Sequence, residues 1–142
     1  MLLSPTGVDL GAWEADFGAA QAPADLSAFA RGLKASFIPN VCIIDCSASE
    51  RVAGHYEEWM RQGIHVIPPN KRANSGPFDY WARLRELGRK SYTHYFYEAT
   101  VGAGLPIIST LQSLRDSGDR ISRIEGRSEE HTSELQSRQY LV

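Results

Sequence analysis

Short apolar runs and longer amphipathic segments alternate along the chain from residue 41 onward. Short strand-like runs occupy 41–44 (VCII), 65–67 (HVI) and 95–97 (YFY), and the segments between them repeat apolar residues at helical spacing. Strands that alternate with amphipathic helices are typical of βαβ units, in which the strands run parallel. The pattern therefore predicts an α/β fold built on a parallel sheet, with helices on both faces.

Three helices are expected around these runs. Ser49 is the predicted N-cap of the first and Gly63 its left-handed end, Ser75-Gly76-Pro77 opens the second, and Pro106 begins the third, which Gly118 closes. Their expected apolar positions are Val52, Tyr56, Trp59, Met60, Tyr80, Trp81, Leu84, Leu87, Ile107, Ile108, Leu111 and Leu114.

Weaker signals lie at the two ends of this pattern. Residues 9–17 and 24–34 are predicted to be helices, the second because its apolar residues recur at core spacing. Residues 119–126 are a candidate fourth strand with Ile121 and Ile124 as its apolar positions, although their odd spacing places them on opposite faces.

Composition and charge narrow the class of protein. The chain has 142 residues and a formal net charge of -2, from 15 Lys and Arg against 17 Asp and Glu. Nucleic-acid binding requires clustered cations, so we expect no nucleic-acid partner. No run approaches the roughly 18 apolar residues of a membrane span, and Met1–Pro5 lacks a basic region before an apolar core. We therefore expect a cytoplasmic protein without a membrane partner.

The two cysteines, Cys42 and Cys46, bracket the end of the first apolar run. Four strand steps separate their backbones by roughly 13 Å, whereas a disulfide needs less than about 7 Å. We expect two reduced thiols packed in the core of a cytosolic protein.

The loops that follow the three apolar runs are the candidate ligand site. In an open parallel sheet the strand-to-helix loops share one edge, and ligands bind in the crevice there. Ser47 and Ala48, after the first strand, could approach a phosphate, ribose or nicotinamide group closely, or the serines could simply cap the next helix. Lys71 follows a rigid Pro-Pro-Asn turn and could pair with a phosphate or an oxyanion, or could be an ordinary surface lysine. Asp45 is interpreted as a buried anchor of the first turn.

Glu98 and the turn Gly102-Ala103-Gly104 follow the third run. A glycine turn before a helix can direct amide groups at an anion, whereas a carboxylate with backbone carbonyls would bind a cation. A third possibility is a tight turn that lets helix and strand pack closely. The residues alone do not choose between these alternatives.

Four stretches in fixed order resemble one enzyme family. They are DCSAS at 45–49, HVIPPNKRA at 65–73, YEATVGAGLPI at 97–107 and GDRISRIEG at 118–126. Together they resemble homoserine dehydrogenase, especially the form fused behind an aspartate kinase. The resemblance implies a Rossmann-type domain that uses NADP(H) or NAD(H) to interconvert aspartate 4-semialdehyde and homoserine by hydride transfer. That reaction belongs to threonine, methionine and isoleucine biosynthesis, and the intact enzyme would be a homo-oligomer.

The resemblance also implies roles for individual residues. Ser47 and Ala48 would contact the cofactor, at positions where the family more often has threonine and serine. Lys71 would bind the cofactor and be needed for activity. A sodium site would be formed by Glu98 and by the backbone carbonyls of Val101, Ala103 and Leu105.

Several parts of that enzyme have no counterpart in the chain. The family's glycine-rich phosphate loop would lie before Met1, and its substrate-binding carboxylates and second lysine beyond Gly126. We therefore expect a partial Rossmann-like, doubly wound sheet without the N-terminal glycine-rich βαβ unit. A fragment of this kind should be inactive alone and should leave apolar faces uncovered.

The expected division of the chain has three parts. Residues 1–105 would be the partial NAD(P)-binding domain and residues 106–126 the start of the catalytic and dimerisation domain. Residues 127–142 would be a non-native tail, because RSEEHTSELQSR at 127–138 is polar, lacks periodicity and is similar to a translated sequencing adapter. The alternatives are another NAD(P)-dependent amino-acid dehydrogenase and a regulatory module that binds a nucleotide without turnover.

Overall fold

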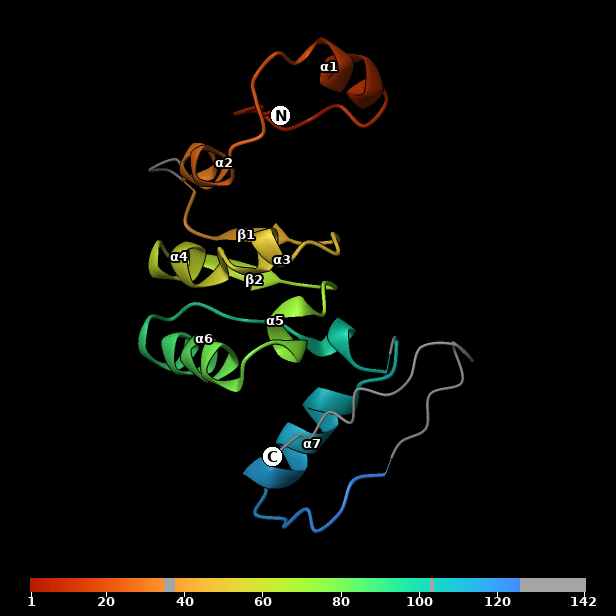
Figure 1. Ribbon diagram of the computed structural model, residues 1–142. Coiled ribbons are helices and arrows are strands. Elements are labelled where there is room, and N and C mark those ends of the chain that lie inside the picture. Colours follow the sequence, from red (N-terminus) through yellow and green to blue (C-terminus); the bar gives the residue numbers. More distant parts are fainter. Residues whose placement is uncertain (35–37, 103, 126–142) are drawn as a thin grey trace.

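The computed structural model describes residues 1–34, 38–102 and 104–125, which form short helices around a small parallel sheet (Figure 1). The elements in chain order are α1 (Trp13–Ala19), α2 (Leu26–Leu33), β1 (Val41–Ile44), α3 (Glu50–Ala53), α4 (Tyr56–Arg61), β2 (Ile64–Ile67), α5 (Arg72–Ser75), α6 (Phe78–Lys90), the 3₁₀ turn η1 (Glu98–Thr100) and α7 (Ile107–Asp116).

The two strands confirm the predicted parallel sheet. β1 and β2 pair in parallel, with Val41 opposite Ile64 and Ile44 opposite Ile67. The third apolar run joins β2 only through a single parallel bridge between Val66 and Tyr95. It does not extend into the predicted strand, because the chain turns into η1 directly after residue 97. The α/β class is thus confirmed, with a smaller sheet than the sequence predicts.

The expected helices form, with one interruption. The predicted helix after β1 is divided into α3 and α4 at Gly54-His55. Ser49 caps it as predicted, its hydroxyl accepting the Val52 amide at 3.3 Å, and Gly63 has the predicted left-handed conformation with φ of +83°. Asp25 caps α2 by accepting the Ala28 amide at 2.9 Å.

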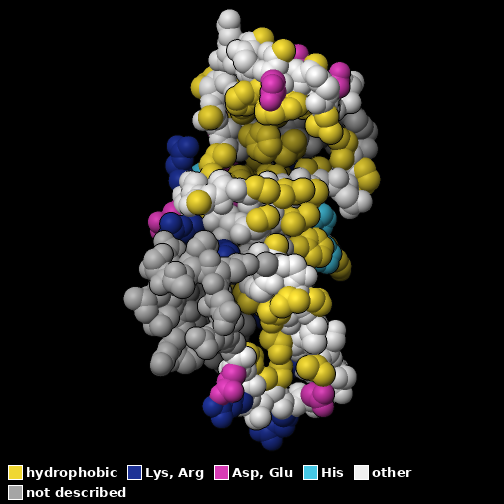
Figure 2. All heavy atoms as spheres, turned by 90° about the vertical axis from the view of Figure 1, so that its right-hand side faces the viewer, with side chains coloured by type: hydrophobic (Ala, Val, Ile, Leu, Met, Phe, Trp, Pro, Cys, Tyr) yellow, Lys and Arg dark blue, Asp and Glu magenta, His cyan; other side chains and the backbone are white. Residues whose placement is uncertain are grey.

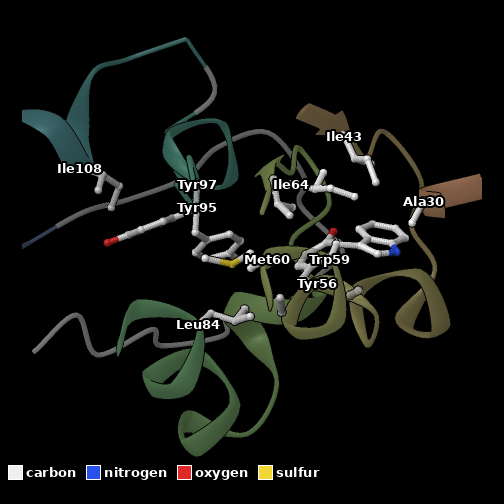
Figure 3. Packing of buried hydrophobic residues seen from close by; sticks show 13 residues of the cluster. Ala30, Ile43, Tyr56, Trp59, Met60, Ile64, Leu84, Tyr95, Tyr97 and Ile108 are labelled. Carbon is white, nitrogen blue, oxygen red and sulfur yellow. The ribbon is translucent and has the colours of Figure 1, made fainter. Parts of the chain in front are cut away.

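The core lies between one face of the sheet and helices α4 and α6 (Figure 3). Tyr56, Trp59 and Met60 of α4 pack against β2, and Leu84 of α6 closes the other side. All four side chains are buried, and each such burial stabilises the fold by about 1.5–3 kcal/mol. The helical spacing seen in the sequence is therefore the spacing of the core.

Within the described residues, no helix covers the opposite face of the sheet. Cys42 and Ile44 alternate with the buried positions of β1 and point away from α4, so Ile44 is 61% exposed, and Phe96 beside β2 is 50% exposed. The prediction that helices cover both faces of the sheet is therefore wrong for the residues the structure describes. The prediction that a fragment of this kind leaves apolar surface uncovered is confirmed. Cys42 and Cys46 are free and exposed, so their predicted burial is also wrong.

The two ends of the chain carry less packing. Among the described residues, α1 contributes no side chain to the core, and residues 117–125 after α7 contribute none either. Residues 119–125 form no strand, and Ile121 and Ile124 are about half exposed, so the predicted fourth strand is wrong over these residues because two apolar positions on opposite faces give no pairing surface. Gly118 ends α7 as predicted, with φ of +97°. Within the described ranges no helix has the length and hydropathy needed to cross a membrane.

Candidate functional site

The loops after β1 and β2 meet at one edge of the sheet. Both strands point toward the same side of the molecule in Figure 1, and Figure 2 looks onto that side. Pairing continues past the strand ends, because the Asp45 amide donates to the Ile67 carbonyl and the Asn70 amide donates to the Asp45 carbonyl, each at 3.1 Å. The first two predicted ligand loops are therefore neighbours.

Asp45 is the buried centre of this edge. The residue is only 4% exposed. Its carboxylate accepts hydrogen bonds from the Tyr56 hydroxyl at 2.5 Å, the Ser47 backbone amide at 2.8 Å and the Asn70 side-chain amide at 2.8 Å. Burial acts to raise the pKa of Asp45, but the hydrogen bonds from Tyr56, Ser47 and Asn70 outweigh it, and the net pKa is lowered. Burial, together with the bond to Asp45, raises the pKa of Tyr56. An ionised Asp45 thus anchors the turn, as the sequence analysis interpreted it.

Lys71 lies on the second loop, directly after Asn70. Asn70 donates from its side-chain nitrogen to Asp45 and to the Ser49 carbonyl at 3.0 Å, and its side-chain oxygen accepts the Arg72 amide at 3.0 Å. Lys71 stands inside that last turn, is exposed and has no ion pair among the described residues. Its ammonium is available to an anionic ligand.

Ser47 and Ala48 form the exposed tip of the first loop. Ser47 Oγ accepts the Ser49 amide at 3.2 Å, while capping of α3 is done by Ser49. The Ala48 carbonyl accepts Arg72 Nε at 3.4 Å, a further link between the two loops. Ser47 is therefore not the helix cap. Its small side chain lies exposed at the edge of the sheet where the loops after β1 and β2 meet, which we call the rim (residues 45–49 and 70–71).

Hydrogen bonds of Asn74 join α5 to the third predicted ligand loop, which begins at Glu98. Asn74 donates to Thr100 Oγ1 at 2.8 Å and accepts the Tyr95 hydroxyl at 2.6 Å, and Thr100 in turn donates to the Tyr97 carbonyl at 2.7 Å. From the sequence, Asn70 was expected only as part of the loop that carries Lys71, with no bonding role of its own, and Asn74 was not expected at the site. The preference of asparagine for turns in which its side chain bonds to the backbone two residues on was the available signal for Asn70.

Glu98 in the third loop is turned toward α7. Its two carboxylate oxygens accept the Ile108 and Ser109 amides, each at 2.8 Å, and so cap the helix. The turn between Glu98 and α7 needs a glycine at residue 102. Gly102 has φ of +72°, and an added Cβ would collide with the Ile107 side chain. This is the tight-turn alternative of the sequence analysis.

Two of the implied cation ligands keep lone pairs that the described hydrogen bonds do not use. Two amide donors leave about half of a carboxylate's four lone-pair sites free, so Glu98 keeps capacity for a cation. The Leu105 carbonyl accepts the Ile107 amide at 2.9 Å and retains a second lone pair, Val101 adjoins the same turn, and Ala103 lies outside the described residues. Across the described ranges, no three His, Cys, Asp or Glu residues come together as a metal site.

A parallel sheet whose strand-to-helix loops meet at one edge, with an exposed lysine and small residues there, is typical of a Rossmann-like nucleotide-binding domain. The family model described as homoserine dehydrogenase, NAD binding domain, matches residues 4–98. The chain belongs to this family. Membership confirms the predicted family and the use of a nicotinamide cofactor by the domain.

Curated relatives agree with this assignment. A bifunctional aspartokinase/homoserine dehydrogenase from Arabidopsis thaliana is 56% identical over 127 residues, which are 89% of this chain and 14% of the relative. The bifunctional enzyme of Haemophilus influenzae is 37% identical over 126 residues, 89% of this chain and 16% of its own length. The chain thus spans about one seventh of the length of these relatives.

A solved structure has the same fold. A protein of unknown function from Candida auris superposes with a TM-score of 0.72 at 30% identity, covering 80% of this chain and 31% of that one. The arrangement of the described elements is therefore that of a larger folded protein.

Proposed function

We propose that this chain forms part of the cofactor site of a homoserine dehydrogenase, which interconverts L-aspartate 4-semialdehyde and L-homoserine with NADP(H), or with NAD(H). The observation that carries the proposal is the rim on which Ser47, Ala48 and Lys71 lie, tied together by the buried Asp45 and Asn70. The name homoserine dehydrogenase, which the relatives carry, supports the reaction class, and the substrate pair is the one that the resemblance implies.

The residues of the rim have separate tasks in this proposal. Ser47 and Ala48 leave room for the cofactor to approach the backbone, and Ser47 offers a hydroxyl for a hydrogen bond. Lys71 supplies a positive charge for a cofactor phosphate or for the oxygen that gains charge during reduction. When bound, the nicotinamide gives or accepts the hydride.

A monovalent cation, sodium by resemblance, is the second part of the proposal. Glu98 would be its charged ligand, with carbonyls of Val101, Ala103 and Leu105. The free lone pairs of Glu98 support this, because capping α7 and binding a cation are then compatible.

The test uses a full-length enzyme that contains this chain. The matched 127 residues of the Arabidopsis relative would be replaced by those of this chain, giving the grafted enzyme. Its NADPH oxidation with the semialdehyde and its NADPH Kd would be compared with those of Lys71→Ala, Ser47→Ala and a control, Lys90→Ala. Lys90 is an exposed lysine paired with Glu86 at the end of α6.

Lys71→Ala should lower kcat/KM or raise the NADPH Kd by about tenfold or more, since a hydrogen bond to a charged group contributes about 1.5–3 kcal/mol. Ser47→Ala should have a smaller effect, and Lys90→Ala none. A grafted enzyme that turns over and is insensitive to Lys71→Ala would contradict the proposed site.

The proposed organisation of the chain has its own test. Residues 1–105 are assigned to the cofactor domain, 106–126 to the start of the catalytic and dimerisation domain of a homo-oligomeric, cytoplasmic enzyme, and 127–142 to a non-native tail. The 142-residue chain alone should show no turnover, and a grafted enzyme that carries only residues 1–126 of this chain should be active without residues 127–142. Turnover by the isolated chain near the rate of the grafted enzyme would refute this division.

A further inference from the structure

We infer that Asn70 is a positioning residue that fixes Lys71 between the two strand-exit loops, with the Asp45 carboxylate as its partner. The inference rests on the proposed function, because it concerns the lysine to which that function assigns the cofactor contact. Asn70 is not itself expected to touch the cofactor.

Asn70 is held by its backbone amide and by both polar atoms of its side chain. It is 3% exposed, its backbone amide donates to the Asp45 carbonyl, and its side-chain nitrogen donates to Asp45 and to the Ser49 carbonyl. Its side-chain oxygen accepts the Arg72 amide. These bonds restrain the backbone on both sides of Lys71 while the lysine side chain stays exposed.

The backbone of Lys71 is restrained from the other direction as well. Its carbonyl accepts the amides of Asn74 and Ser75 at 3.1 and 3.0 Å and the Ser75 hydroxyl at 3.0 Å. The base of the lysine side chain is thereby fixed relative to the first loop. Pre-ordering of this kind lowers the entropy that a ligand contact would otherwise cost.

The chemistry of the contact requires an amide at residue 70. Its side-chain nitrogen faces two acceptors, the ionised Asp45 carboxylate and the Ser49 carbonyl, so only a donor fits there. An aspartate of the same shape would set two carboxylates at hydrogen-bond distance, and their repulsion would raise the pKa of one of them. The charged and titratable groups facing this point are Asp45, Tyr56 of α4, and Lys71 and Arg72 at α5.

This requirement predicts the behaviour of Asn70→Asp in the grafted enzyme. Its NADPH Kd should rise by about tenfold or more at pH 8, where both carboxylates are charged, because a bond to a charged group is lost and repulsion is added. Binding should recover as the pH is lowered and the pair takes up one proton. The control Asn40→Asp, at an exposed asparagine, should match the unsubstituted enzyme over the same pH range.

Exchanging the two residues provides the rescue. In Asp45→Asn with Asn70→Asp, an amide again faces a carboxylate across the loops. The Ser49 carbonyl loses its donor, and the Tyr56 hydroxyl, which donates to the same Asp45 oxygen as Asn70, must instead accept from the new amide. The exchange should recover at least about fivefold of the lost affinity at pH 8 and abolish the pH dependence. A role confined to filling space would give neither the pH profile nor the rescue.

Three outcomes separate the inference from the proposed function. Asn70→Asp binding as tightly as the unsubstituted enzyme at pH 8, or an exchange that recovers nothing, would overturn the inference while a damaging Lys71→Ala keeps the function. An unaffected Lys71→Ala would overturn the function itself. If Asn70→Asp does not fold at pH 8, the exchange alone decides, since it should fold and bind.

Discussion

Removing the Glu98 carboxylate should loosen the start of α7 in the grafted enzyme. Glu98 accepts two amides at 2.8 Å each, and bonds to a charged acceptor contribute about 1.5–3 kcal/mol when buried. The Ser109 bond is exposed, and helix caps typically contribute about 1 kcal/mol. Glu98→Ala should therefore lower the free energy of local opening of α7 by about 1–2 kcal/mol.

Amide hydrogen exchange of peptides from residues 107–116 measures this opening. A loss of about 1–2 kcal/mol corresponds to exchange about 5–30-fold faster. Glu98→Gln, which keeps one acceptor oxygen and loses the charge, should lie between Glu98→Ala and the unsubstituted enzyme. Glu86→Ala, at a surface glutamate on α6 paired with Lys90, is the matched control and should leave α7 unchanged.

Unchanged exchange of α7 in Glu98→Ala would refute the capping role. If sodium also slowed exchange of α7 only when Glu98 is present, the carboxylate would serve a cation in place of the helix. Slowing by sodium together with fast exchange in Glu98→Ala would support both roles at once.

Other consequences of the structure can be checked directly. Because the pKa of Asp45 is lowered in the folded state, ionised Asp45 stabilises the fold at pH values above its ordinary pKa of 3.8. The urea midpoint of the grafted enzyme should therefore fall as the pH is lowered below 3.8, and it should fall less in Asp45→Asn. Leu84→Ala should destabilise by about 2–5 kcal/mol, whereas Leu10→Ala, at an 83% exposed residue, should change stability by under about 0.5 kcal/mol in the same denaturation. Cys42 and Cys46 should both react with a thiol reagent in the native 142-residue chain at rates near those of the unfolded chain, and slow reaction at Cys42 would show that the face of the sheet away from α4 is covered.

The sequence predicted the elements whose apolar spacing is unambiguous. β1 and β2 followed from continuous apolar runs that end in turn residues, and α6 from the spacing of its core positions around Leu84. The break at Gly54 was not predictable, because periodicity continues across it and only the local backbone shows the interruption. Ile44 and Phe96 were misjudged because an apolar residue signals a buried position only where another element covers it.

The site was predictable in outline. Because the carboxyl ends of parallel strands lie at one edge of a sheet, the sequence predicted that Ser47 and Lys71 lie on the same rim. In the structure their neighbours Ala48 and Arg72 are joined by a hydrogen bond across that rim. The bonds that hold the rim were not predictable, since they join residues 21 to 26 positions apart and depend on the register of β1 and β2. The helix cap provided by Glu98 depends likewise on how the turn at Gly102 folds back.

A crystal structure of the grafted enzyme with NADP(H) tests the central claim most directly. The account predicts that the nicotinamide half of the cofactor lies against residues 45–49, with the Lys71 ammonium within hydrogen-bond distance of it and Asn70 still bonded to Asp45. Cofactor density elsewhere in the enzyme, with Ser47 and Lys71 both in contact only with solvent, would contradict it.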